Sequence, residues 1–443
     1  MAEYHRLSVV GLGCGSPGLL NGQAMDALRQ SDAVFVSNRL SSLLDWHPCV
    51  IGMKDIASSL DEIESRLKTC DVAVAVSGDP GIFSFLGRLK ERLGDRRGAF
   101  AENIGVVPGI SSVQYLFAEL QESWSDAVII SAHGRVINDA EIMRAVSENR
   151  KTVIFCDPVR NPEWVCGILT RYIDSFMEEE ERGSVRIAIG ENLSRDGQRI
   201  LRAAAEEAAG LAAAEGPFAS PSIVAVFNDT PSEQPRARPR DEDFIRSDVP
   251  MTCQEVRSAA LDELNLSRDS IVWDVGSGSG SVAVACSMVC RDGEVCAIER
   301  SREAVGLILR NRRKFRSFNL RVFEGSAPDI MQGPSGLPGH PDSPGLPVPT
   351  HVFVGGSGGR LRDILRHIAG LGAGIKVVVS AVTLRTIAEV SDMFTDPVLF
   401  TEPEVLSISV ARSRPLGSSS LIAARNPVML WSSRTVGENK EKM

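Results

Sequence analysis

The segment 271–301 limits what this chain can fold into more than any other stretch. It reads IVWDVGSGSGSVAVACSMVCRDGEVCAIERS: a strand, a turn with glycines at 276, 278 and 280, a helix, and a second strand that ends on Glu299. Glycine suits such a turn because it adopts backbone angles that other residues avoid, and because it lets a ligand approach the backbone. This order of elements predicts a parallel α/β sheet with a nucleoside-binding turn at its edge.

Two classes of cofactor fit this turn. From Gly278 onward it satisfies the loose G-x-G-x-x-A pattern of dinucleotide sites, and the helix that begins near Ser281 presents amides that favour a phosphate or carboxylate. Asp274, two residues before Gly276, extends the pattern to D-x-G-x-G-x-G, which is typical of methyltransferases that use S-adenosylmethionine (SAM). Glu299 is placed to accept hydrogen bonds from both ribose hydroxyls of an adenosine. These features favour SAM, with a dinucleotide as the alternative.

Length and composition indicate the class of protein. A chain of 443 residues exceeds what one hydrophobic core usually supports, so we expect two or three domains. A net charge of -9 argues against general nucleic-acid binding, which needs a basic face. The nine cysteines form no C-x-x-C pair, so we expect a reducing cytoplasm and neither a disulfide framework nor a metal site. A leader and long apolar runs are lacking, so we expect a protein that is neither exported nor membrane-spanning.

Two runs of alternating strands and helices are separated by a polar segment. The first run ends with SIVAVFN at 222–228, and DTPSEQPRARPRDEDF follows it. Because this proline-rich, charged stretch reads as a linker, we predict a domain over 1–230, a linker over 231–247 and a second domain over 248–435. Inside the second domain, 333–349 is so rich in proline and glycine that we expect a disordered surface insertion.

The first domain has its own glycine-containing loops after strand ends. The loop at 13–18 reads GCGSPG and matches G-x-G-x-x-G, but the next strand ends at Ser37 without the acidic residue that a dinucleotide site would supply. Further loops read SGDPGIF at 77–83, VPGISS at 107–112 and SAHGR at 131–135. In this order the loops resemble those of the tetrapyrrole methylases, a SAM-dependent family.

This resemblance implies two α/β subdomains, over about 1–110 and 111–230, with SAM held in the cleft between them. The first loop departs from the family pattern G-x-G-P-G-D, because Cys14 stands for the proline and Ser16 for the acid. The implied cofactor-binding residues are Gly78, Asp79, Ile82, Ser111, Ser112, Ala132 and Gly134.

The second domain carries a separate series of strings. PMT at 250–252, FVGGSGG at 353–359 and AVTL at 381–384 resemble the decarboxylating corrin methyltransferases that act on precorrin-6B or its cobalt form. The implied fold is a class I, Rossmann-like SAM methyltransferase domain. Cys253 departs from the family pattern, which commonly has lysine there, and Ser326 stands for an acid. The implied SAM-binding residues are Thr252, Gly276, Ser277, Gly278, Ser279, Gly280, Glu299, Ser326 and Ala327, and the implied positioning loop for the macrocycle is Gly355, Gly356, Ser357, Gly358 and Gly359.

Together the two resemblances imply a bifunctional SAM-dependent C-methyltransferase of cobalamin biosynthesis, with two SAM sites on unrelated folds. The first domain would methylate carbon 5 of the corrin precursor. The second would methylate carbon 15 and decarboxylate the acetate on carbon 12. The alternatives are another tetrapyrrole-modifying fusion of a methyltransferase with an oxidoreductase, and a non-catalytic carrier of corrin intermediates. We also expect a homo-oligomer.

The implied chemistry needs few acids or bases, because methyl transfer depends mainly on alignment of the reacting carbon with the methyl group. We therefore assign no catalytic residue. The substrate would carry many carboxylates, which arginine binds bidentately. The candidate arginines are Arg257, Arg300, Arg302, Arg385, Arg412 and Arg414.

Overall fold

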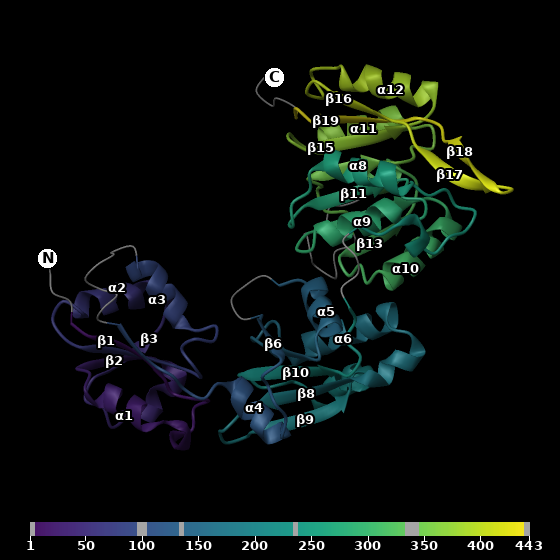
Figure 1. Cartoon of the computed structure of the whole chain (residues 1–443). Coiled ribbons are helices and arrows are strands. Elements are labelled where there is room, and N and C mark those ends of the chain that lie inside the picture. Colours follow the sequence, from purple (N-terminus) through teal and green to yellow (C-terminus); the bar gives the residue numbers. More distant parts are fainter. Residues whose placement is uncertain (1–4, 95–103, 133–136, 234–237, 333–344, 438–443) are drawn as a thin grey trace. The chain divides into compact units, whose positions relative to one another are not determined.

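The computed structural model describes residues 5–94, 104–132, 137–233, 238–332 and 345–437 (Figure 1). The chain divides into two compact units, which are each assembled from several segments. The first unit consists of Met1–Val136, Ala145–Ile173 and Glu178–Pro231, and the second of Ile137–Arg144, Asp174–Met177 and Ser232–Met443.

The first unit begins with a five-stranded parallel sheet in the order β3-β2-β4-β1-β5. Its central strands are continuous apolar runs, as expected for strands that are buried on both faces. Helix α1 covers one face of the sheet, and α2 and α3 cover the other (Figure 1). The elements are β1 (Leu7–Gly11), α1 (Gly22–Arg29), β2 (Ala33–Ser37), the 3-10 helix η2 (Asn38–Leu44), β3 (Val50–Met53), α2 (Ile56–Arg66), β4 (Val72–Val76), α3 (Phe85–Gly94) and β5 (Ile104–Val107).

A second sheet of the first unit has the order β6-β7-β10-β8-β9, in which only β6 and β7 pair in parallel. Helix α4 begins with a capping box between Ser111 and Gln114 and packs Phe117 against this sheet. The elements along this part of the chain are α4 (Ser112–Leu120), β6 (Ala127–Ser131), α5 (Asp139–Glu148), β7 (Lys151–Phe155), α6 (Pro162–Phe176), β8 (Val185–Glu191), β9 (Arg199–Ala204), α7 (Ala208–Glu215) and β10 (Ser222–Asn228). The beginning of α5 and the end of α6 belong to the second unit.

The second unit is built on a seven-stranded sheet in the order β13-β12-β11-β14-β15-β19-β16. The first five strands in this order are parallel, and β19 and β16 are antiparallel. One face packs against α8, α9 and α10, and the other against α11 and α12. The elements are α8 (Gln254–Leu264), β11 (Ile271–Val275), α9 (Ser281–Val289), β12 (Glu294–Glu299), α10 (Arg302–Lys314), β13 (Leu320–Glu324), β14 (His351–Val354), α11 (Leu361–Gly370), β15 (Lys376–Ala381), α12 (Leu384–Phe394), β16 (Glu404–Ile408) and β19 (Val428–Arg434).

Strand order in this sheet reverses between β11 and β14. After β11 the chain builds β12 and β13 on one side, and it then returns to build β14 and β15 on the other. In open α/β sheets, ligands bind outside the carboxyl ends of the strands at such a reversal. The turns after Val275 and Val354 therefore lie where a ligand site is expected.

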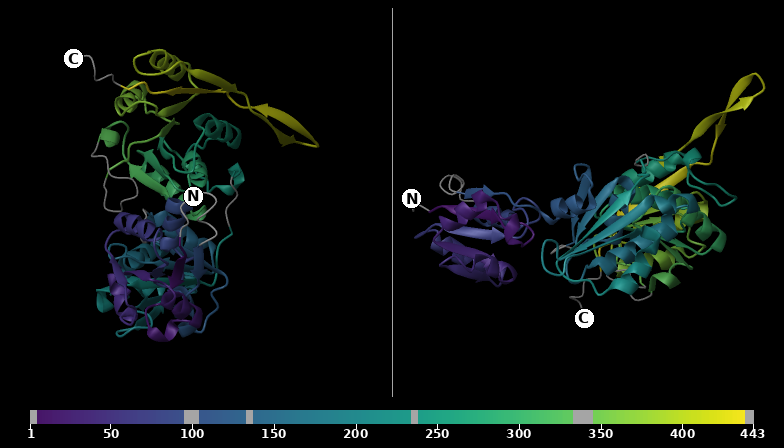
Figure 2. Two further views of the ribbon diagram at one scale, coloured as in Figure 1. Left: turned by 90° about the vertical axis from the view of Figure 1, so that its left-hand side faces the viewer. Right: turned by 90° about the horizontal axis from the view of Figure 1, so that it is seen from below.

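A two-stranded hairpin, β17 (Ala411–Leu416) and β18 (Ser419–Ala424), extends from the seven-stranded sheet (Figure 2). Neither strand contains a buried residue. Its turn is closed by Gly417, whose φ of +59° lies in the left-handed region that glycine tolerates. The hairpin is thus joined to the unit mainly through its base.

The predicted α/β class is confirmed in both halves of the chain. The segment 333–349 differs from the expectation at its carboxyl end, while residues 333–344 lie outside the described residues. Leu346 is 6% exposed, and the Pro347 carbonyl accepts a hydrogen bond of 3.0 Å from the Trp273 indole nitrogen. The Leu346 side chain and the hydrogen bond from the Trp273 indole hold residues 346 and 347 against the core. Within the described residues, no helix has the length and apolar character that crossing a membrane requires.

Candidate functional site

A cavity of about 920 Å³ lies at the carboxyl ends of β11, β12 and β14 in the second unit. This volume is at the upper end of the range for small-molecule sites. Most of the second-domain residues predicted to form the site line it. They are Thr252, Gly276, Ser277, Gly278, Glu299, Arg300, Ser326, Ala327, Gly355, Gly356, Ser357 and Gly358.

The glycines of this site allow backbone segments to lie against one another. A Cβ on Gly276 would overlap the carbonyl of Gly356, so the turns after β11 and β14 can meet only without side chains. A Cβ on Gly278 would lie 3.0 Å from the Pro250 carbonyl oxygen, and one on Gly358 would lie 3.0 Å from a guanidinium nitrogen of Arg300. Each glycine also has a positive φ, except Gly356. The floor of the cavity is therefore largely bare backbone.

Glu299 is held in place by backbone amides. Its Oε1 accepts hydrogen bonds from the Arg300 and Ser301 amides at 2.8 and 2.9 Å, and its Oε2 accepts one from the Gly278 amide at 2.9 Å. Each carboxylate oxygen has two lone pairs, so one acceptor position remains, on Oε2. That position could take a ribose hydroxyl, and acceptance from both hydroxyls stays a prediction.

Asp274, on β11, places its carboxylate at the first turn of α9. It is 1% exposed, and its Oδ2 accepts from the Ala283 amide at 3.0 Å and from the Ser277 hydroxyl at 2.6 Å. Burial raises its pKa to about 6. Because a carboxylate of the chain already occupies this helix end, a pyrophosphate would meet a like charge there. This argues against the dinucleotide alternative, and it also argues against a cofactor carboxylate near Ser281.

Three of the selected residues do not line the cavity. The Ser279 carbonyl accepts from the Asn311 side chain at 3.0 Å. Gly280 has a φ of +79° and packs closely on Ile308, where an added Cβ would lie 3.1 Å from the side chain. Both residues shape the turn rather than face the cavity. The third residue, Gly359, has open space around it and is not among the residues that line the cavity.

The structure places most of the candidate arginines away from the cavity. Arg385, on α12, is bound to Glu389 on the same helix at 2.9 Å, and Arg414 lies exposed on the hairpin strand β17. Arg302 begins α10 outside the cavity lining. Arg257 is 2% exposed, because it belongs to a buried ion-pair network instead. Of the candidates, only Arg300 lines the cavity.

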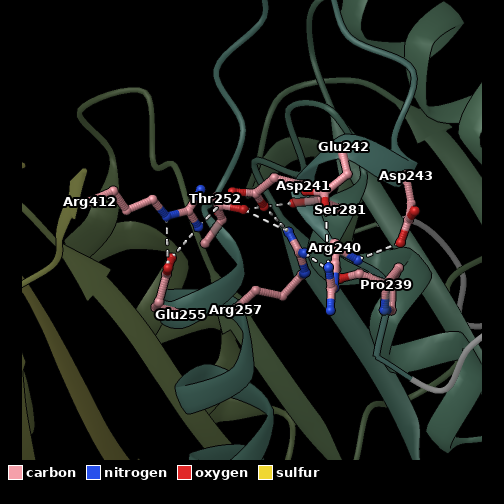
Figure 3. A network of polar contacts seen from close by, with 10 residues as sticks. All are labelled: Pro239, Arg240, Asp241, Glu242, Asp243, Thr252, Glu255, Arg257, Ser281 and Arg412. Carbon is pink, nitrogen blue, oxygen red and sulfur yellow. Dashed lines mark hydrogen bonds and ion pairs between the residues drawn. The ribbon is translucent and has the colours of Figure 1, made fainter. Parts of the chain in front are cut away.

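The buried network joins the base of the hairpin to the cavity wall (Figure 3). Arg257 and Arg412 both point toward Asp241, with nitrogen–oxygen distances of 3.3 and 3.2 Å (Figure 3). Arg257 also donates to the carbonyls of Thr252 at 2.9 Å and Pro239 at 2.7 Å. Since Thr252 lines the cavity, Arg257 and Arg412 support the site from outside it.

Two further arginines, which were not predicted from the sequence, line the cavity. Arg360 pairs with Asp329 at 2.6 Å. It directly follows the glycine-rich loop 355–359, and this position in the sequence could have identified it. Arg425 follows the hairpin, and its amide donates to the Val410 carbonyl at 2.9 Å across the hairpin base. No local pattern marks Arg425, since the fold alone brings it to the cavity.

Three of the four selected loops of the first unit, at 13–18, 77–83 and 107–112, meet at the carboxyl edge of β1, β4 and β5. Asp79 links two of them, because its Oδ1 accepts from the Gly81 amide at 2.7 Å and its Oδ2 from the Gly109 amide at 3.1 Å. A Cβ on Gly109 would overlap the carbonyl of Gly78, and Gly78 forms a bridge with Gly13. The three loops therefore form one compact backbone surface.

The remaining first-unit candidates are placed as follows. Ser111 caps α4 by accepting from the Gln114 amide at 3.2 Å, and Ser112 is the first residue of that helix. Ile82 is half-buried in the loop that begins with Gly78. Ala132 is buried at the end of β6, in the other sheet, and its amide donates to the Phe155 carbonyl at 3.0 Å. Gly134 lies outside the described residues.

Comparison with known families finds a match for each half of the chain. Residues 6–209 match the family described as tetrapyrrole (corrin/porphyrin) methylases. Residues 243–435 match the family described as the precorrin methyltransferase domain.

Individual relatives span one or both halves. A precorrin-6Y C(5,15)-methyltransferase (decarboxylating) from a Sinorhizobium species is 25% identical over 431 residues, which are 96% of this chain and 95% of that protein. A probable cobalt-precorrin-6B C(15)-methyltransferase (decarboxylating) of Pyrobaculum calidifontis is 34% identical over 194 residues, 43% of this chain and 92% of that protein. The crystal structure of a precorrin-6Y C5,15-methyltransferase from Geobacter metallireducens is 30% identical, covers 46% of this chain and 99% of its own, and has a TM-score of 0.40.

Proposed function

We propose that this protein methylates a corrin precursor at two carbons and removes carbon dioxide from it. The proposal rests on its family, because the chain belongs to the decarboxylating precorrin methyltransferases of cobalamin biosynthesis. The first unit would methylate carbon 5. The second unit would methylate carbon 15 and decarboxylate the acetate on carbon 12. The observation that carries the proposal is that the second unit has a cavity, and the first unit a cluster of glycine loops, at the carboxyl edge of a parallel sheet.

The second-unit cavity fits SAM. When bound, SAM supplies an electron-poor methyl group carried on a sulfonium sulfur. Gly276 and Gly278 line the cavity and would present backbone to the nucleoside. Glu299 would accept a ribose hydroxyl through the remaining lone pair of Oε2. Ser326 and Ala327 would border the adenine from the loop after β13.

Substrate carboxylates would be held by the arginines that line the cavity. Among the described residues, Arg300 and Arg425 have side chains in no ion pair, so their guanidinium groups are available to a carboxylate. Held in this way, the macrocycle would present one carbon toward the methyl group and keep the neighbouring acetate ionised. Loss of carbon dioxide leaves an electron pair that the conjugated ring system can accept, so the protein needs no additional electron sink.

A second SAM site in the first unit is part of the proposal. Gly78, Asp79 and Ser111 would border it, with Ile82, Ser112, Ala132 and Gly134 as further members. Its support is the surface formed by the three first-unit loops, where Gly11 and Gly109 lie too close to one another and to the Gly78 carbonyl for side chains. Asp79 fixes this surface by bonding to two amides, so its loss should disorder the loops.

The test is mass spectrometry after incubation of the protein with SAM and a precorrin-6B-level substrate. Wild-type protein should add two methyl groups and lose one carbon dioxide. Gly278→Val should abolish one methylation, and Asp79→Ala the other. Gly306→Ala serves as the control, because an added Cβ there meets no atom within 4 Å. If both single variants still add both methyl groups, the division between the two units is wrong.

The same experiment separates the alternatives. A non-catalytic carrier would bind the corrinoid without acquiring label from methyl-labelled SAM. A methyltransferase–oxidoreductase fusion would bind NADH tightly at the second unit, and the position of Asp274 at the start of α9 speaks against that. The predictions of a homo-oligomer, of a cytoplasmic location and of no affinity for nucleic acid remain open to sedimentation, cell fractionation and binding assays.

A further inference from the structure

Arg195 lies in the loop between β8 and β9, with its side chain packed against the first glycine loop of the same unit. Its Nε donates to the Cys14 carbonyl at 2.8 Å. The guanidinium covers Gly15, where an added Cβ would overlap it and where φ is +107°. Only glycine at this position leaves room for the arginine, so the two loops are fitted to one another.

The guanidinium of Arg195 has unused hydrogen-bonding capacity. Its Nη2 is buried and has no hydrogen-bond partner among the described residues. Leaving a charged donor buried and unsatisfied is unfavourable, and native proteins rarely do so without a ligand or water at the site. A group that supplies an acceptor would remove this cost.

The surroundings provide a second positive charge and no described counter-ion. Arg39 is an exposed residue of η2, directly after β2, and its pKa is lowered, first by desolvation of part of its side chain and then by the charge of Arg195. Burial raises the pKa of the Cys14 thiol to about 11, so this neighbour carries no negative charge at neutral pH. Among the residues that the structure describes, neither arginine forms an ion pair. The two cations thus form a site of uncompensated positive charge.

The location of this site relates it to the cofactor loops. Cys14 contacts the Ile110 carbonyl through its thiol, at 3.6 Å, and Gly13 bridges to Gly78. Arg39 and Gly15 both follow strands of the same parallel sheet, at its carboxyl edge. An anion bound between the arginines would therefore lie beside the loops proposed to hold SAM in this unit.

We propose that Arg195 and Arg39 form a carboxylate-binding subsite, which anchors a peripheral carboxylate of the tetrapyrrole beside the first-unit SAM loops. This inference deepens the proposed function of the first unit and rests on it. Guanidinium groups bind carboxylates through paired hydrogen bonds, and Nη2 of Arg195 supplies a donor that the chain itself leaves unused. Both arginines are positioning residues, since they would hold the substrate and take no part in bond making.

The test uses fluorescence titration of the full chain with uroporphyrin III, a tetrapyrrole with carboxylates on every ring. Arg195→Gln should weaken binding about tenfold, as expected for loss of a charged hydrogen bond. Arg39→Gln should weaken it less. Arg88→Gln, which removes an exposed cation from α3 of the same unit, should leave the affinity unchanged. The second-unit cavity is the same in all variants, so the differences report on the first unit.

Ser16→Asp is the complementary variant. It places a carboxylate one residue from Gly15, where it should compete with the probe for Arg195 and so weaken binding without removal of any arginine. This variant and Arg39→Gln keep the test decisive if Arg195→Gln does not fold. The affinity for SAM, measured by calorimetry, should stay at the wild-type value in all of them.

The inference is overturned if Arg195→Gln and Arg88→Gln bind the probe equally, or if SAM affinity falls as much as probe affinity. Failure of the proposed function has a different signature. In that case no methyl group reaches the corrinoid, while the probe still discriminates between Arg195→Gln and Arg88→Gln. Conversely, if Arg195→Gln still methylates carbon 5 with an unchanged KM, the subsite inference is wrong and the proposed function stands.

Discussion

Arg412 and Glu255 form a two-point ion pair across 157 positions of the sequence, with nitrogen–oxygen distances of 2.8 and 2.7 Å. The pair joins the base of β17 to the first turn of α8. Both side chains are about a third exposed, at 37% and 34%. We therefore expect Arg412→Gln to lower the free energy of unfolding by only about 1 kcal/mol. Urea denaturation checks this against Arg414→Gln, an exposed neighbour on the same strand, and an equal loss in both would contradict it.

The buried side of the same network should contribute much more. Among the described residues, Arg257→Leu would leave Asp241 in the interior with Arg412 as its one charged partner. A broken buried pair costs about 3–5 kcal/mol. The double variant Arg257→Leu/Asp241→Asn should lose less than the sum of the two single variants, because it leaves no unpaired charge. Denaturation of all four proteins measures this coupling, and strict additivity would count against it.

Gly276→Ala tests the contact between the turns after β11 and β14. The added Cβ would overlap the Gly356 carbonyl and would also strain a φ of +70°. We expect loss of SAM binding at the second unit of more than about tenfold, which calorimetry would detect as one site fewer. Gly306→Ala, in α10, has open space and should instead stabilise the protein by about 0.5–1 kcal/mol. Unchanged SAM binding in Gly276→Ala would show that the turn is not part of the cofactor site.

Arg425→Gln tests the assignment of substrate carboxylates to the cavity. The KM for the corrinoid in carbon-15 methylation should rise about tenfold, while the affinity for SAM and the rate constant kcat stay close to wild type. Arg414→Gln removes a cation from the hairpin outside the cavity lining and should alter neither constant. A fall in kcat with constant KM would instead place Arg425 nearer to the reacting atoms.

Asp274 should make stability depend on pH. Its native pKa of about 6 exceeds the value of about 3.9 for an exposed aspartate, so the native state binds the proton more tightly. Its contribution to stability is complete below about pH 4 and is lost as pH rises through 6, a change of about 3 kcal/mol. In Asp274→Asn this dependence should vanish, which urea denaturation between pH 4 and 7 would show. The control is Asp262→Asn, at an exposed position, whose pH profile should follow wild type.

Local sequence was enough to predict the turn after β11 and its neighbouring elements. The apolar run before Gly276, the glycine spacing and the acidic end of β12 all lie within 271–301. Their roles depend on covalent proximity, because a strand, a turn and a helix that follow one another must meet. The carboxyl edge of the sheet, and with it the site, follows from the parallel order.

The charged residues of the site were harder to predict, because their environment is set by distant segments. Arg257 is buried by Asp241 and by the carbonyl of Pro239, and neither is marked by a pattern. Arg425 reaches the cavity only because β17 and β18 pair and return the chain to Val410. The sequence shows where the arginines are, but it does not show which of them are already paired with a carboxylate of the chain.

The exposed hairpin has a consequence for local dynamics. With no buried residue in β17 or β18, its backbone hydrogen bonds are protected only by the base of the hairpin. Amide hydrogens there should exchange with solvent by local opening, much faster than those of β19 in the sheet. Since Arg425 directly follows β18, the wall of the cavity that carries it shares this low protection. We therefore expect opening of the hairpin base to release Arg425 from its backbone bond to Val410.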